Sequence, residues 1–270
     1  MIHRSTFLFA LLAAGAASVA TTANVPTPNA LNLMRQSSQV SSVQDSRAQT
    51  MFRLTSAGGK VREQLASTIT RQMGSGTSGA ARLARFLSPS DVKGTAVLTV
   101  EQAIRDDDIW LYLPALGKVR RLQAENKRDA YMGTDLSYGD VIGHAPEEWN
   151  HRVTGSAIVD GAQCWIIESL PRSPSVAASS GYGRRVNWVR SDNAMMVRAE
   201  LYSVQGHLSK RIAQRAITRV SQSPARWQAM HIVAENVQSR HRTDIILSGY
   251  QANIGLAADQ FTPRALERGR

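Results

Sequence analysis

From Gln44 onward the sequence is a succession of short runs in which apolar and polar residues alternate, separated by turn signals. One such run is 109–113, and the runs 150–159 and 164–170 flank the dipeptide Asp160-Gly161. Alternation with a period of two is typical of strands that bury one face, and Asp-Gly is a strong hairpin signal. The chain has no repeat of fixed period and no βαβ spacing. We therefore expect a mainly β protein in which about eleven strands form a single antiparallel sheet, curled into an incomplete barrel.

Helical patterns are few and short. Residues 29–43 predict one weak amphipathic helix, and a second helical piece is expected at 133–143, where Thr134 is a candidate cap. A short C-terminal helix is expected to begin at Phe261-Thr262-Pro263. Residues 172–181 are rich in Ser and Ala and predict a polar loop.

The N-terminal residues have the three-part layout of a secretory signal peptide. His3 and Arg4 precede an unbroken apolar run at 7–17, and Ser18-Val19-Ala20 offers small residues for cleavage. A buried N-terminal helix is the alternative. We expect a signal peptide at 1–20, cleaved near Ala20, and a single domain at 21–270. The protein is not expected to be a lipoprotein itself, because no cysteine lies near the cleavage site.

The net charge of +11 comes mostly from arginine, with 27 Arg and only 5 Lys among the 32 basic residues. No aromatic RNA-binding box, zinc-finger spacing or dense basic block is present, so a nucleic-acid partner is not expected. In an exported protein, this charge favours transient contact with anionic lipid head groups or an acidic protein, or else it is diffuse surface charge.

No arrangement of side chains points to catalysis, to a metal or to a cofactor. His144 and His151 are seven residues apart, which does not suit a helical zinc pair, and Cys164 lies within a predicted strand. We find no nucleophile motif and no phosphate-binding loop, so an enzyme is not expected.

The alternation predicts which face of the sheet is dry. Polar residues on the opposite faces include Arg185, Arg198, Glu200, Asp244 and Ser248. In 109–113 both faces are apolar, so Trp110 and Tyr112 are alternatives for the inner face. An apolar face of this extent is either a core filled by its own side chains or a cavity for an apolar ligand. The residues expected to line it are Ile109, Leu111, Leu113, Trp165, Ile167, Trp188, Leu201, Met230, Ile245 and Leu247.

Three segments in order give the chain a family resemblance. Residues 85–96 match F-x-x-P-x-D-x-K-G, residues 107–121 match D-D-x-W-x-Y-L-P-x-x-x-K-V-R-R, and residues 131–140 match F-x-G-[ST]-D-[FL]-x-Y-x-D with the aromatic Tyr131 one position early. The chain resembles the LolA-like family of outer-membrane lipoprotein-sorting proteins, and the looser similarity continues to residues 259–262.

The resemblance implies an incomplete antiparallel barrel, similar to LolA and LolB, with short helices over its concave apolar side. It also implies a periplasmic carrier that binds lipid or the acyl chains of lipid-modified proteins and moves them between envelope membranes. The alternative is a non-catalytic module that docks on an inner-membrane RND/MMPL-type transporter or another envelope complex.

Charged residues surround the most specific segments, and we expect them at the rim of the barrel. We hypothesise that at least one arginine pairs with Asp135 and ties the short helix at 133–143 to the rim. The alternative is that all of them are solvated. The rim residues are Lys118, Arg120, Arg121 and Asp135.

Overall fold

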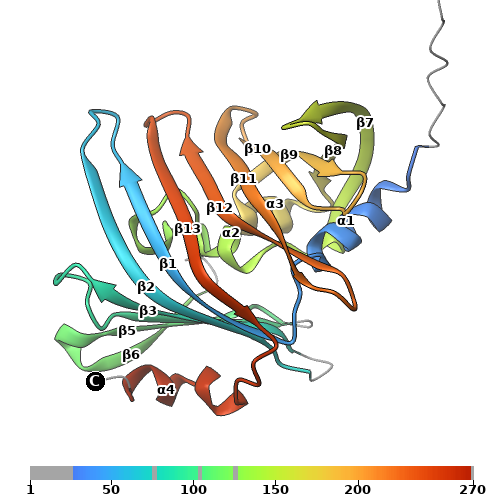
Figure 1. The fold of residues 1–270 in the computed structure, drawn as a ribbon. Helices are drawn as coiled ribbons and strands as arrows, with labels where there is room; N and C mark the ends of the chain where they lie inside the picture. Colours follow the sequence, from blue (N-terminus) through green and yellow to red (C-terminus); the bar gives the residue numbers. More distant parts are fainter. Residues whose placement is uncertain (1–26, 75–77, 103–104, 124–126, 269–270) are drawn as a thin grey trace, which may run out of the picture.

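Thirteen antiparallel strands form one sheet in the computed structural model, which describes residues 27–74, 78–102, 105–123 and 127–268 (Figure 1). The predicted signal peptide at 1–20 lies outside the described residues. The sheet order is β6-β5-β4-β3-β2-β1-β13-β12-β11-β10-β9-β8-β7. The first and last strands of the chain therefore pair at the centre of the sheet, while β6 and β7 form its two unpaired edges. The expectation of a mainly β protein with a single open sheet is confirmed.

The strands follow one another as hairpins on each side of the central pair. Their bounds are β1 Asp45–Thr55, β2 Val61–Gln72, β3 Ser78–Ser88, β4 Ala96–Gln102, β5 Asp108–Leu113, β6 Lys118–Leu122, β7 Trp149–Val159, β8 Ala162–Pro171, β9 Tyr182–Arg190, β10 Met196–Ser203, β11 Leu208–Ser221, β12 Arg226–Asn236 and β13 His241–Ala252.

The expected count of about eleven strands is too low. The strand β6 carries the sequence KVRRL, which is short, charged and largely exposed, so it shows no apolar alternation. It forms because Leu113 pairs with Lys118 across the Gly117 turn, where the backbone is left-handed (φ 58°). Pairing with β5 therefore creates this edge strand, and local preference does not.

Among the residues that the structure describes, four α-helices lie outside the sheet: α1 (Ala30–Gln39), α2 (Tyr138–Ile142), α3 (Pro174–Ser180) and α4 (Pro263–Glu267). The first, second and fourth were expected. The third replaces the predicted polar loop, because Ser173 caps it, Pro174 opens it and Gly181 ends it in a left-handed conformation. No helix in the described part of the chain is long and apolar enough to cross a membrane.

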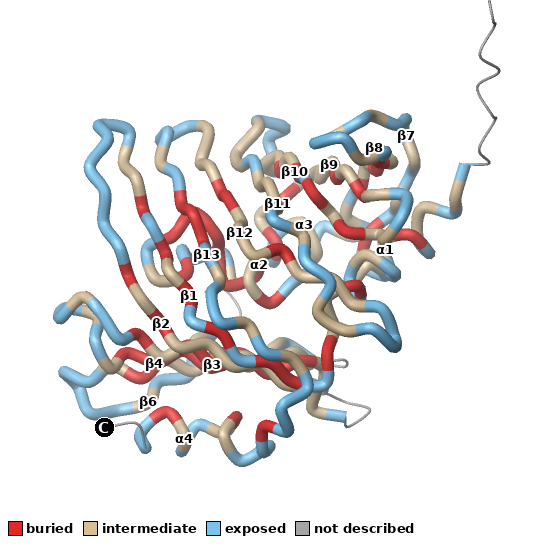
Figure 2. Tube along the Cα trace, viewed as in Figure 1, coloured by how far each residue is buried: buried red, intermediate tan, exposed pale blue. Residues whose placement is uncertain are grey.

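The sheet is strongly bent, so that it has an inner and an outer face (Figure 1). The segment that contains α2 lies inside the bend, whereas α4 lies against the outer side of β4, β5 and β6. Buried residues concentrate along the bend and inside it (Figure 2). Helices therefore cover both sides of the sheet, and not the concave side alone as the family resemblance implied.

Candidate ligand-binding face

The inner face of the sheet carries one large apolar cluster, called here the inner cluster. It draws side chains from the two central strands and from their neighbours on both sides, which is possible only because the sheet curves around it. Its buried members are Phe52, Leu54, Ala66, Ala84, Phe86, Val97, Ile109, Tyr131, Leu136, Tyr138, Ile142, Ala234 and Ile245.

Residues 131–142 fill this inner face. Tyr131 packs edge-on against Tyr138, with ring centroids 5.3 Å apart, and also contacts Phe52. The side chain of Ser137, and not the expected Thr134, caps α2 by accepting a hydrogen bond from the backbone N–H of Asp140, whose carboxylate accepts one from the N–H of Ser137. The segment is thus a small, well-defined plug that buries aromatic rings against the sheet.

The strand β5 has two apolar faces, and the structure shows where each points. Ile109 and Leu111 pack in the inner cluster. Trp110 and Tyr112 pack on the outer side with Leu266 of α4. The outer helix therefore explains why both faces of this strand are apolar.

The other residues expected to line the inner face divide into three groups. Ile245 and Leu247 of β13 join the inner cluster, and Leu113 and Met230 have the same parity as Leu111 and Ile232 on their strands. Leu201 is fully buried beside Trp149. Trp165 and Ile167 pack with Leu33 of α1.

Trp188 is a correction to the sequence analysis. It pairs with Ile166 and Arg198, and the Arg198 guanidinium carbon lies 4.5 Å from the centroid of its ring, so it faces away from Ile167 and Leu201. The inner positions of β9 are instead Arg185, Asn187 and Val189. Arg185, expected on the polar face, sits opposite Leu201.

The predicted rim residues do not act together. Lys118 and Arg120 are exposed on the edge strand β6, and Arg121 pairs with the buried carboxylate of Asp108. Burial acts to raise the pKa of Asp108, but hydrogen bonds from Arg105 and Arg121 hold that pKa below its usual value.

The hypothesis of an arginine partner for Asp135 is wrong. Its carboxylate lies 2.7 Å from His241 Nδ1 and accepts a 2.7 Å hydrogen bond from Thr243 Oγ1. The plug at 131–142 is tied to the sheet, as expected, but its partners are the first residues of β13.

A group of polar side chains lies inside the bend, beside the inner cluster, and is called here the Asp140 cluster: Asp140, His144, Tyr182, Arg185 and Lys210. Asp140 accepts hydrogen bonds from Lys210 Nζ at 2.7 Å and from the Tyr182 hydroxyl at 3.0 Å. His144 Nε2 lies 3.8 Å from the same carboxylate. Sequence reasoning missed this cluster, because its members are far apart in sequence and carry no shared motif.

The ionisation states in the Asp140 cluster follow from burial and from neighbouring charges. Burial acts to raise the pKa of Asp140, but His144, Lys210 and the Ser137 N–H together hold that pKa well below its usual range. Burial, followed by the charge of Arg185, lowers the pKa of His144. Burial and the Asp140 charge raise the pKa of Tyr182. At neutral pH we therefore assign a charged Asp140, a neutral His144 and a neutral Tyr182.

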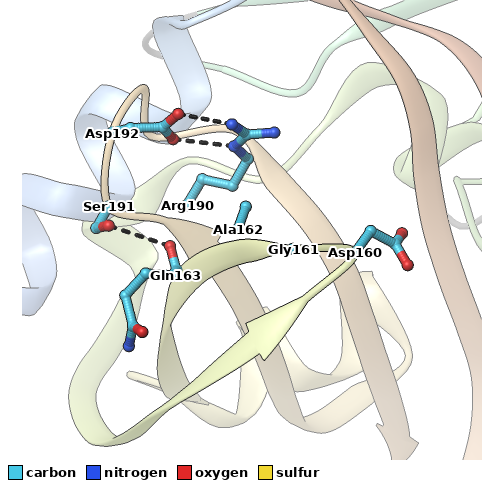
Figure 3. Close-up of a pocket in the computed structure, with 7 residues that line it drawn as sticks. All are labelled: Asp160, Gly161, Ala162, Gln163, Arg190, Ser191 and Asp192. Carbon is cyan, nitrogen blue, oxygen red and sulfur yellow. Dashed lines mark hydrogen bonds and ion pairs between the residues drawn. The ribbon is translucent and has the colours of Figure 1, made fainter.

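Two shallow hollows open near the β7–β8 turn, away from the Asp140 cluster. One, of about 350 Å³, has a largely polar lining in which Arg190 is paired to Asp192 and Ser191 is bonded to the Gln163 carbonyl (Figure 3). The other, of about 460 Å³, shares Asp160 and Arg190 with the first. Neither is lined mainly by the apolar residues of the inner cluster.

These features match a known family. A family model described as that of an uncharacterized protein matches residues 79–268, which include β3 to α4. The chain belongs to the DUF1329-like family. Among curated proteins, none matches the chain.

Solved structures extend the likeness to nearly the whole described chain. The DUF1329-like chain is 25% identical to a putative outer membrane lipoprotein-sorting protein domain from Vibrio parahaemolyticus, with a TM-score of 0.80 over 88% of this chain and 98% of that one. It is 28% identical to a DUF1329 family protein from Desulfovibrio piger, with a TM-score of 0.80 over 87% and 97%.

A LolA superfamily protein from Nitrosomonas europaea has the same fold at 17% identity, with a TM-score of 0.65 over 87% of this chain and 98% of that one. The resemblance to LolA-like lipoprotein-sorting proteins, drawn from three short segments, is therefore confirmed.

Proposed function

We propose that this DUF1329-like protein is a periplasmic carrier that binds lipid, or the acyl chains of lipid-modified proteins, on the inner face of its sheet. The observation that supports this most is the inner cluster, an apolar surface spread over both arms of an open sheet and covered by the small plug at 131–142. The likeness to a putative lipoprotein-sorting domain supports the same conclusion.

Physical chemistry favours a carrier of this design. Each buried CH₂ group contributes about 0.8 kcal/mol, so an acyl chain gains several kcal/mol when it leaves water for an apolar face. The carrier needs no catalytic group, only a covered apolar surface that can be uncovered. The plug has to move for this, because Tyr131, Leu136 and Tyr138 occupy the inner cluster in the structure.

Leu111 offers a direct test, since its side chain packs against the inner cluster from β5. A charge placed there has to lose its hydration without gaining a partner. We expect Leu111→Asp to weaken binding of a fluorescent fatty acid by tenfold or more, and Arg198→Asp on the outer face to leave it unchanged. Equal binding by the parent and both folded variants would contradict the proposal.

A disulfide between the plug and β13 provides a second test. The side chains of Asp135 and Thr243 are in hydrogen-bond contact, so Asp135→Cys combined with Thr243→Cys places two thiols where the plug meets β13. Once mass spectrometry shows the disulfide, we expect fatty-acid binding to be lost, and to return on reduction. Unchanged binding in the oxidised protein would mean that the fatty acid does not bind beneath the plug, and would contradict the inner face as the binding surface.

A further inference from the structure

The Asp140 cluster carries more positive than negative charge. Asp140 is ionised, and Lys210 compensates it directly at 2.7 Å. Arg185 adds a second cation, while His144 and Tyr182 are neutral. Between the described residues no ion pair or hydrogen bond reaches Arg185. One positive charge therefore remains uncompensated inside the bend of the sheet.

The donors around Arg185 also lack acceptors. Its Nε is shielded from solvent and has no hydrogen-bond partner, and the same holds for Nε1 of Trp149, whereas His144 Nε2 faces the Asp140 carboxylate at 3.8 Å. Arg185 and Trp149 lie together, since the Arg185 guanidinium carbon is 5.1 Å from the Trp149 ring centroid. Buried N–H groups are nearly always paired in folded proteins, so this group is incomplete.

Burial of the Arg185 Nε adds to the free-energy cost of leaving it without a hydrogen-bond partner. Arg185 is only partly buried as a residue, although its Nε is shielded from solvent; burial lowers its pKa, while the charge of Asp140 acts to raise it. Breaking or omitting one partner of a buried charge is strongly destabilising, whereas an apolar side chain of similar size would pack there without that cost.

The inner cluster lies directly beside this group. On the single turn of α2, Tyr138 and Ile142 pack in the inner cluster, whereas Asp140 lies in the Asp140 cluster. An elongated molecule on the inner face would thus meet both an apolar surface and the Asp140 cluster.

We propose that Arg185, with the N–H group of Trp149, binds the oxyanion of an amphiphile whose acyl chain lies on the inner cluster. The ligand class is a carboxylate or phosphate head group, because Arg forks match both and the group offers donors only. This inference rests on the proposed carrier function and specifies its ligand: an anionic lipid, and not a neutral one.

The test compares lauric acid, dodecyl phosphate and dodecanol, which share one chain and differ in head group. We expect the parent protein to bind the two anions at least tenfold more tightly than dodecanol. Arg185→Met is expected to lose this preference while it binds dodecanol as the parent does. Arg184→Met is the matched control, because Arg184 is the next residue back on β9, faces outward and lies over the Tyr202 ring. It is expected to keep the preference.

Thermal unfolding separates this role from a structural one. Without ligand, Arg185→Met is expected to unfold at a higher temperature than the parent, because it removes an uncompensated charge. A lower unfolding temperature would make Arg185 a structural residue and overturn the assignment. So would binding of inorganic phosphate as tightly as dodecyl phosphate, which would assign the site to a free oxyanion.

The failures of the two proposals are distinguishable. If acid, phosphate and alcohol bind the parent equally, the carrier function stands and the oxyanion site is wrong. If Arg185→Met keeps the preference for anions, the site is likewise wrong. If none of the three binds, the carrier function fails, and the oxyanion site fails with it.

Discussion

The two parts of the inner face differ in how they are held together. On β1 to β5 and β13 the plug buries aromatic and aliphatic side chains, and its hydrogen bonds to the sheet lie at its margin, as at Asp135. Beside it, on β9 and β11, the same plug meets charged groups through Asp140. The apolar part is stabilised by area removed from water, and the polar part by a balance of charges. The plug thus contacts an apolar part and a polar part of the inner face. Substitutions in the two parts should differ in how they change stability and ligand binding.

The largest effect is expected from removing the negative charge of the Asp140 cluster. Asp140→Asn keeps the shape and leaves two cations without a carboxylate, so we expect the free energy of unfolding to fall by about 3–5 kcal/mol. Chemical denaturation measures it. Adding Lys210→Met should recover part of the loss, because it removes one of the cations, and a double variant no more stable than the single one would contradict the charge balance.

The apolar part should respond through cavity formation alone. Ile142→Ala removes a buried side chain of the plug, and we expect a loss of about 2–5 kcal/mol that does not change with salt concentration. Leu266→Ala on the outer helix α4 is the matched control for size and burial, with a loss in the same range. Only the change in the plug should alter fatty-acid binding. An equal effect of both on binding would remove the distinction between the two faces.

A smaller effect is expected from acid, and it should arise in the polar part. Burial lowers the pKa of His144, so the unfolded chain binds a proton that the native protein refuses. Stability is therefore full above the unfolded pKa of about 6.5, falls as the pH decreases from there toward the lowered native pKa, and levels off below it. His151, whose pKa burial also lowers, adds to the same trend.

Melting temperatures at pH 7 and pH 5 measure this trend. His144→Gln should show a smaller drop than the parent between these two values. His207→Gln, on an exposed turn, is the control and should keep the parent's drop. A His144→Gln variant with the full drop would assign the pH dependence to other groups.

The smallest effect is expected on the outer face. Arg198 pairs with Glu200 and lies over the Trp188 ring, but its side chain is 46% exposed. Exposed pairs of this kind contribute about 0–1 kcal/mol, so Arg198→Ala should change stability little and leave ligand binding intact. A loss of stability comparable to that of Asp140→Asn would mean that burial does not decide how much a charged side chain contributes to stability.

Sequence patterns predict the apolar part of the molecule well and the polar part poorly. Apolar alternation places Ile109, Leu111 and Ile245 on one face, because each gains by leaving water. On β9 the same reasoning gives the wrong faces, because it predicts Trp188 on the inner face and Arg185 on the outer face. Nothing in the local sequence shows that Asp140 and Trp149 lie near Arg185. Long-range partners decide that strand, and a single sequence does not reveal them.

The pairing of β1 with β13 at the centre of the sheet, called here the central seam, is also not predictable from local sequence patterns. Thr50 lies opposite Leu247, yet neither strand carries a signal for the other. The hairpins on either side are predictable, because short turns such as Asp160-Gly161 connect neighbouring strands. The one pairing that joins the two arms is not.

The central seam affects the order in which the chain can fold while it is being synthesised. Hairpins with short turns close quickly, whereas contacts between distant residues are slow to form. Each arm can assemble from its own hairpins before β13 is made, but β1 has no central partner until β13 has emerged. Until then the strands that will pair at the centre of the sheet have bare edges, and such edges invite pairing with other chains. A chain that lacks β13 would stay in that state.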